Sequence, residues 1–239
     1  MKMPRSIREN SSDGPGVPSL VVGLTGRVHG QGNKHQQKTE ETRRRLLLSA
    51  RKVFARDGFE AARLEDISQE AGHTRGAFYA HFSSKEGLFF ALLEQQAYEH
   101  QLAMQRLLSP RQESKDKLRA LCEYYVAKAG DRRWSLLMLE FKLYAIRHPK
   151  IREKLAKTHR AIRQAFRHEI EGLLPSDMRP SFQQESLLPV VLEALLHGLI
   201  LEHAYDSAAL KQEEVEGVLR RVFHLLTSGQ EDERTGESA

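Results

Sequence analysis

The segment from residue 64 to residue 80 constrains the fold most, because it predicts two short helices joined by a tight turn. Leu64, Ile67 and Ala71 recur at helical spacing and would place one apolar face against a core. Gly72 follows them and can adopt the left-handed conformation that commonly ends a helix. This pattern indicates a helix–turn–helix, a unit that can place its second helix in the major groove of DNA.

The second helix of this unit is predicted to run from Thr74 to about Ala80. The Thr74 side chain can cap its first turn, and Ala77 and Phe78 would face the core. The residues expected to face outward are His73, Thr74, Arg75, Gly76 and Tyr79. Glycine is a poor helix former on an exposed face, so Gly76 would serve to let the backbone approach DNA closely.

Helical spacing continues on both sides of this unit, and no convincing strand is found. A helix is expected over 39–56, and the next one is expected to start near Ser84, with Ser83 as its cap and Glu86 reaching back. The expected helices after the unit span 84–108, 113–129, 132–147, 150–174, 184–206 and 209–227. The predicted fold class is all-α, with an N-terminal three-helix domain joined by a long helix to a C-terminal helical bundle that dimerises.

Four regions are expected along the 239 residues. Residues 1–35 are rich in Gly, Ser, Pro, Asn and Gln and are predicted to be a disordered extension. The remaining regions are a helix–turn–helix domain over 36–83, a ligand-binding and dimerisation domain over 84–228, and a disordered tail over 229–239.

Composition narrows the class of protein. The formal net charge of +5 gives mild support for a polyanionic partner. The single cysteine, Cys122, excludes an intramolecular disulfide framework and reads as a small buried hydrophobe. No apolar run is long enough to span a membrane, so we expect a cytoplasmic protein without a membrane partner. The usual nucleophile and metalloprotease motifs are missing, so we expect no enzyme.

One run of residues resembles the N-terminal domain of the TetR family of transcriptional regulators. The similarity covers about residues 40–93 and rests on Asp66-Ile67, Ala71-Gly72, Thr74-Arg75-Gly76-Ala77, Tyr79, His81-Phe82 and Ser84-Lys85-Glu86. The resemblance implies a repressor that binds a palindromic operator as a dimer. It also implies a C-terminal domain that dimerises and usually holds a small molecule, whose binding releases the operator.

The resemblance also implies DNA contacts. Thr74 and Arg75 would meet base edges or nearby phosphates, with Gly76 close against the groove. The residues expected to contact the phosphate backbone are Tyr79, His81 and Lys85.

The chain departs from the family pattern at two positions. Arg63 stands where a threonine or serine is usual, and it can supply a phosphate contact instead. His73 replaces a small apolar residue in the turn; it either reads a base or sits exposed, and we favour exposure.

A ligand cavity in the second domain would lie between helices and be mostly apolar. The candidate lining residues are Tyr124, Tyr125, Trp134, Met138, Phe141, Tyr144, Glu193 and His197, each of which also suits an ordinary core. Glu193 and His197 share a helix face and, with His203, suggest a metal- or pH-responsive sensor. A hydrogen-bonded core histidine is the preferred interpretation, and we expect neither a metal nor a cofactor.

The two last helices predict a homodimer. The stretch from Leu187 to Leu201 is apolar nearly all round, so it must be covered on more than one side. We therefore expect subunits to pair through the helices near 184–206 and 209–227. The alternative function is a constitutive architectural DNA-binding protein without a ligand, suggested by the basic N-terminal arm.

Overall fold

The computed structural model describes residues 34–109, 113–171 and 187–227, and all regular structure within these ranges is helical. The helices are α2 (Lys34–Asp57), α3 (Leu64–Glu70), α4 (Arg75–Tyr79), α5 (Lys85–Leu108), α6 (Ser114–Lys128), α7 (Arg132–Arg147), α8 (Pro149–Glu171), α10 (Leu187–Tyr205) and α11 (Gln212–Thr227). The all-α prediction is confirmed. The expected tail and nearly all of the expected N-terminal extension lie outside the described residues, although positions 34 and 35 belong to α2.

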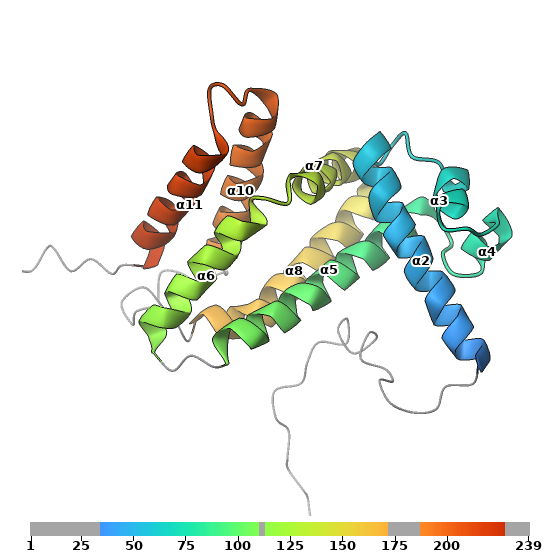
Figure 1. Ribbon diagram of the computed structural model, residues 1–239, viewed down its shortest axis with the longest axis horizontal. Helices are drawn as coiled ribbons and strands as arrows, with labels where there is room; N and C mark the ends of the chain where they lie inside the picture. Colours follow the sequence, from blue (N-terminus) through green and yellow to red (C-terminus); the bar gives the residue numbers. More distant parts are fainter. Residues whose placement is uncertain (1–33, 110–112, 172–186, 228–239) are drawn as a thin grey trace, which may run out of the picture.

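The helices form an elongated arrangement with the helix–turn–helix at one end (Figure 1). Helices α2, α3 and α4 make that end, while α6, α10 and α11 pack together at the other. Helices α5 and α8 run side by side between the ends. Helix α7 contacts α2, α8 and α10, so it joins the two ends. No helix in the described ranges combines the length and apolar character needed to cross a membrane.

The turn and caps of the helix–turn–helix follow local chemistry. Gly72 has a φ of 72°, the left-handed conformation expected at this helix end. The Thr74 side chain accepts a hydrogen bond from the Ala77 backbone N–H at 3.3 Å, which confirms it as the cap of α4. The predicted capping box before α5 is wrong. Ser84, not Ser83, caps α5 by accepting from the Gly87 N–H at 3.0 Å.

Glu86, predicted to reach back to Ser83, also has a partner on another helix. Its Oε1 accepts a hydrogen bond from the Tyr144 hydroxyl of α7 at 2.7 Å. Although burial opposes ionisation, hydrogen bonds from Tyr144 and, to a smaller extent, from groups at the start of α5 lower the pKa of its carboxyl group. The start of α5 is therefore tied to α7.

The main hydrophobic core crosses the predicted boundary between the two domains. Phe59, fully buried, follows Gly58, whose φ of 77° turns the chain after α2. The Phe59 ring centroid lies 4.7 Å from that of Phe141 on α7 and 5.5 Å from that of Phe89 on α5. Glu140 Oε2 also accepts a hydrogen bond from the Phe59 N–H at 2.9 Å. The helix–turn–helix is therefore packed directly on the second domain.

Helices α10 and α11 complete a smaller core around Val126, Ala129, Val215 and Leu219. Cys122 is half-buried beside it, and burial raises the pKa of its thiol. Other apolar residues of α10 remain exposed, although the apolar composition of this helix predicts that they are covered. Val191, Leu201 and Tyr205 remain 45%, 47% and 86% exposed in the single chain.

Replacing Phe59 by alanine should destabilise the whole chain, because it leaves a cavity between α2, α5 and α7. We expect the free energy of unfolding to fall by about 3–5 kcal/mol, measured by urea denaturation. The control is Tyr79→Ala, an aromatic residue of the same domain that is 48% exposed, which should cost less than about 1 kcal/mol. Equal losses in the two variants would contradict a shared core centred on Phe59.

Candidate functional site

The exposed side of α4 carries the residues expected to read DNA. Thr74, Arg75, Gly76 and Tyr79 are all exposed. The Arg75 guanidinium pairs with the Glu65 carboxylate at 2.7 Å and donates a hydrogen bond to the Tyr79 hydroxyl at 3.3 Å. Arg75 is thus held in place on the surface and would exchange its partner Glu65 for a base or phosphate on binding.

Nothing inside the described chain requires a glycine at position 76. A Cβ atom built there would meet only the Thr74 Oγ1, at 3.7 Å, which is an ordinary contact. The space beside Gly76 is therefore open to a partner outside the chain.

The two histidines near the turn are both half-buried. His73 was expected to be exposed, but its Nε2 is buried without a hydrogen-bond partner among the described residues. The preference for an exposed His73 was therefore wrong. His81 is also half-buried, and burial, followed by the charge of Arg43, lowers its pKa.

Lys85 has a structural role besides any contact with DNA. Its Nζ donates hydrogen bonds to the carbonyl oxygens of Glu60 and Ala62, at 2.8 and 3.1 Å. It also lies 4.9 Å from the centre of the Phe59 ring, and burial lowers its pKa. Lys85 therefore fastens the loop between α2 and α3 to α5, and a phosphate contact would use its remaining N–H.

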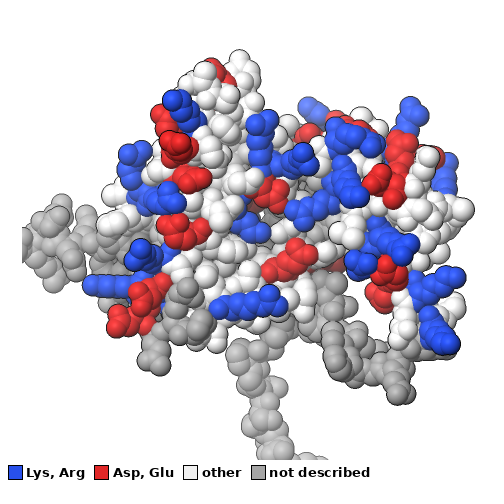
Figure 2. Space-filling view, viewed as in Figure 1, with Lys and Arg blue, Asp and Glu red and all other residues white. Residues whose placement is uncertain are grey.

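Arg63 is exposed at the start of α3, where its side chain makes no capping hydrogen bond. It is therefore placed so that a phosphate could reach it. Basic side chains are frequent over this end of the molecule, with acidic ones among them (Figure 2). On the face shown in Figure 2, this end therefore carries no uniformly basic patch.

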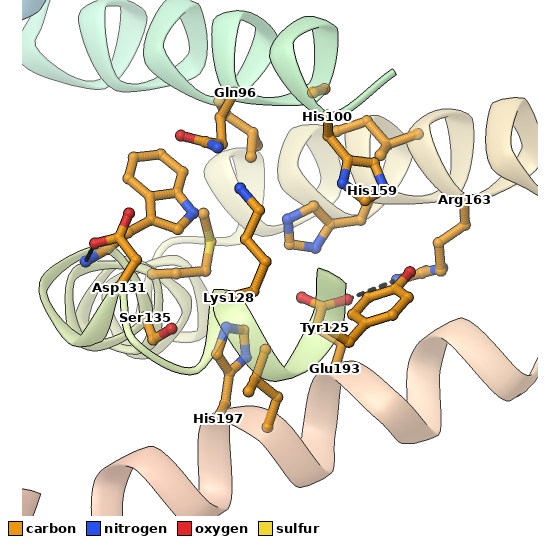
Figure 3. A pocket seen from close by; sticks show the side chains of 16 residues that line it. Gln96, His100, Tyr125, Lys128, Asp131, Ser135, His159, Arg163, Glu193 and His197 are labelled. Carbon is orange, nitrogen blue, oxygen red and sulfur yellow. Dashed lines mark hydrogen bonds and ion pairs between the residues drawn. The ribbon is translucent and has the colours of Figure 1, made fainter. Parts of the chain in front are cut away.

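A cavity of about 210 Å³ lies between α5, α6, α7, α8 and α10 (Figure 3). Five of the predicted lining residues border it: Tyr125, Trp134, Met138, Glu193 and His197. The structure brings other polar side chains to the same cavity. These are Gln96, His100, Lys128, Asp131, Ser135, His159 and Arg163.

Three predicted lining residues do not border this cavity. Phe141 is fully buried in the main core, and Tyr144 packs on Phe59 with its hydroxyl on Glu86. Tyr124 instead forms a hydrogen bond with His100 Nδ1. Helical spacing alone does not show which neighbour each of these three side chains faces, because that depends on how each helix is rotated against its neighbours.

Glu193 is held as a carboxylate by cations. Lys142 Nζ donates to its Oε1 at 2.7 Å, and Arg163 lies 3.9 Å from its Oε2. Burial opposes ionisation, but the charge and hydrogen bond of Lys142 outweigh it, and the pKa of Glu193 is lowered. Burial followed by the charge of Lys142 also lowers the pKa of His197, so this imidazole is neutral near pH 7.

The proposed metal-ligand set does not come together. His203 Nδ1 lies 2.8 Å from the Leu210 carbonyl, near the far end of α10. In residues 34–109, 113–171 and 187–227, no group of three or more His, Cys, Asp or Glu side chains could hold a metal ion. The metal-sensor hypothesis therefore lacks its ligands in this part of the chain.

Both halves of the chain match family models. Residues 46–92 match the model of the bacterial regulatory proteins of the tetR family. Residues 114–227 match the model of the C-terminal domain of BetI-type transcriptional repressors. The chain belongs to the TetR family of transcriptional regulators.

Individual TetR-family relatives are similar to this chain over segments of different length. The transcriptional repressor AcnR of Corynebacterium glutamicum is 38% identical over 60 residues, which are 25% of this chain and only 32% of AcnR. The regulator UidR of Escherichia coli is 26% identical over 178 residues, or 73% of this chain and 83% of UidR. A regulator from Saccharomonospora viridis, solved with choline, shares the fold with a TM-score of 0.60. It is 21% identical, covering 77% of this chain and 96% of that one.

Buried neutral histidines should make stability depend on pH. Burial, with a smaller effect of Lys128, lowers the pKa of His100 to about 4. An unfolded histidine has a pKa near 6.5, so between these values the unfolded chain binds more protons and stability falls as the pH falls. The free energy of unfolding of the wild type should therefore fall between pH 7 and pH 5. We expect this fall to be about 1–2 kcal/mol smaller in His100→Gln, measured by urea denaturation.

The control for this experiment is His35→Gln, on the exposed first turn of α2, which should leave the pH dependence unchanged. An identical pH dependence in wild type and His100→Gln would show that His100 does not contribute to it.

Proposed function

We propose that the chain is a ligand-responsive repressor, which binds a palindromic operator as a homodimer and leaves it when a small molecule fills the cavity. The observation that carries the proposal is a direct connection between the two sites. Asp131 borders the cavity, and its Oδ2 lies 2.8 Å from the Arg51 guanidinium of α2 in the helix–turn–helix domain. The description of the second family model as that of repressors supports the direction of regulation.

Reading of DNA would fall to α4. Arg75 can pair with two acceptors on one guanine, whereas the Thr74 hydroxyl still has its proton to donate while it caps the helix. Arg63, Tyr79, His81 and Lys85 would hold the phosphates on either side. His73 is a weaker candidate, because its Nε2 is buried.

The uncovered face of α10 supports pairing with a second copy. Val190, Val191 and Leu201 are exposed there, and the exposed Ala194 and Gly198 lie between them. A Cβ atom at Gly198 would meet nothing within 4 Å, so the backbone of a partner helix can approach closely. Leu225 on α11, 74% exposed, extends the apolar surface. A symmetric four-helix contact would bury this surface and set two copies of α4 on one face of the DNA.

Release would pass through the N-terminus of α7. Asp131 caps α7 by accepting from the Trp134 N–H at 3.2 Å, and the Arg51 guanidinium lies 5.9 Å from the centre of the Trp134 ring. Asp131 and Trp134 both border the cavity. A ligand that moves them would therefore move α2 and, with it, α3 and α4. The alternative, an architectural DNA-binding protein without a ligand, would leave this cavity without a role.

Selection from a random duplex pool tests the reading of DNA. We expect the wild type to enrich a palindrome and to bind it with two chains per duplex, as measured by sedimentation. Arg75→Ala should lose about 1–3 kcal/mol of discrimination at one base pair of each half-site. Gly76→Ala should raise the free energy of unfolding by roughly 0.5 kcal/mol, because alanine favours helix, yet weaken binding to the palindrome.

The matched control is Arg220→Ala, which removes an exposed arginine that pairs with Glu123 far from α4. It should bind DNA like the wild type. Unchanged sequence preference in Arg75→Ala, or unchanged affinity in Gly76→Ala, would contradict the assignment of α4.

The link between Arg51 and Asp131 can be tested without knowing the ligand. A pair with the same geometry in the free and DNA-bound states cancels from the operator affinity, whereas a pair that changes does not. We expect Arg51→Ala and Asp131→Asn to be non-additive in operator affinity by about 0.5 kcal/mol or more in a double-mutant cycle. The pair Arg220 and Glu123 should be additive, and additivity of both pairs would remove the proposed route.

A further inference from the structure

The charges around the cavity indicate which class of small molecule it takes, an inference that rests on the proposed ligand-responsive function. Figure 3 shows polar side chains from five helices pointing into one space. Several of these side chains are ionisable, and some of them form ion pairs whereas others do not.

Both carboxylates on the wall are already occupied by cations. Glu193 is bonded to Lys142 at 2.7 Å, with Arg163 nearby at 3.9 Å. Asp131 is bonded to Arg51 at 2.8 Å, and its other oxygen accepts from a backbone N–H. A positively charged ligand would have to displace these partners and leave them beside it.

Lys128 is in the opposite situation. Its side chain extends from α6 toward the middle of the cavity (Figure 3), and it has no ion pair within the described part of the chain. Burial lowers its pKa, against the attraction of the Asp131 and Glu99 carboxylates, and its Nζ lies 5.4 Å from the centre of the Tyr124 ring. A half-buried ammonium that is attracted by carboxylates but bonded to neither keeps its N–H groups available to an anionic ligand.

The histidines add hydrogen-bonding capacity without charge. Burial lowers the pKa of both His159 and His197, so both are neutral near pH 7. His197 Nδ1 lies 3.4 Å from the Lys142 ammonium and would accept from it, which leaves the Nε2–H of His197 as a donor. Gln96 and Ser135 border the same space. Groups that can both donate and accept match hydroxyl groups on a ligand.

The balance of charge favours a ligand with a single negative charge over one with two. The charged side chains that line the cavity are two cations, Lys128 and Arg163, and two carboxylates, Asp131 and Glu193. A dianion would place its second charge next to Glu193 or Asp131.

The volume limits its size. The cavity holds about 210 Å³. This is somewhat more than the roughly 150 Å³ that accommodates benzene in an engineered cavity and less than the roughly 300 Å³ typical of drug-sized ligands. A coenzyme A thioester is larger than this volume, so the cavity could enclose only part of it.

We infer that the cavity binds a small hydroxylated monocarboxylate, with Lys128 as the main partner of the carboxylate and the neutral histidines, Gln96 and Ser135 on its hydroxyl groups. The ligand class thus differs from the choline found in the similarly folded regulator from Saccharomonospora viridis. A quaternary ammonium ion would face Lys128 and Arg163, and it would find both wall carboxylates already paired.

The test compares matched compounds for binding and for release of the selected operator. The panel contains hydroxy-monocarboxylates of four to seven carbons, each beside the alditol of the same carbon skeleton (D-gluconate with D-glucitol, for example), and choline. We expect at least one carboxylate to raise the melting temperature and release the operator, while its alditol and choline do neither. The ligand class would be overturned if only choline or the alditols raised the melting temperature, or if none of the carboxylates did.

Lys128→Met separates a binding role from a structural one. It removes the charge at similar length, so the affinity for the best carboxylate should fall about tenfold to a hundredfold, as for loss of a charge-assisted hydrogen bond. The preference for the carboxylate over its alditol should fall with it, which a merely structural role would not cause. Lys115→Met, an exposed position on the same helix, is the control and should change neither quantity. Undiminished preference in Lys128→Met would contradict the inference.

The two proposals fail in different ways. Release of the operator by choline or an alditol would reject the anion and leave the ligand-responsive repressor intact. A carboxylate that binds with high affinity but never releases the operator would support the ligand class and reject the proposed function.

Discussion

The contact of Phe59 with Phe89 and Phe141 is the interaction on which the rest of the structure depends. Its three rings come from the loop after α2, from α5 and from α7, and the Phe89 and Phe141 rings stack with centroids 3.8 Å apart. Because close-packed interiors transmit displacement rather than absorb it, α7 and the helix–turn–helix behave as one packed unit. The Tyr144–Glu86 and Glu140–Phe59 hydrogen bonds strengthen the same junction.

This junction is the route by which, in our proposal, a cavity in the second domain influences DNA binding. The cavity lies between α7 and the helices α5, α6, α8 and α10, and the first turn of α7 borders it through Asp131, Trp134 and Ser135. Arg51 contacts that same turn from α2. In our proposal a ligand needs to move only the start of α7, so no long chain of intermediate contacts is required.

The predictions that depended on neighbouring residues were largely confirmed. Helical periodicity located the helices, Gly72 marked the left-handed turn, and Thr74 capped α4. The predicted cap of α5 was wrong by one residue, because Ser83 and Ser84 have the same chemistry and only the backbone geometry distinguishes them. Glu86 was misassigned because a tyrosine 58 positions away competes for its carboxylate.

The sequence by itself determined the all-helical class, the helix–turn–helix and the surface of α4, since these follow from spacing, caps and turns within a few residues. Only the tertiary structure decided which side chains share the cavity. Periodicity shows that a helix has an apolar face, but not which helix covers it or at what rotation. For that reason His159 and Arg163 of α8 were not foreseen as partners of Glu193, whereas Phe141 and Tyr144 were expected at the cavity and lie in the core instead.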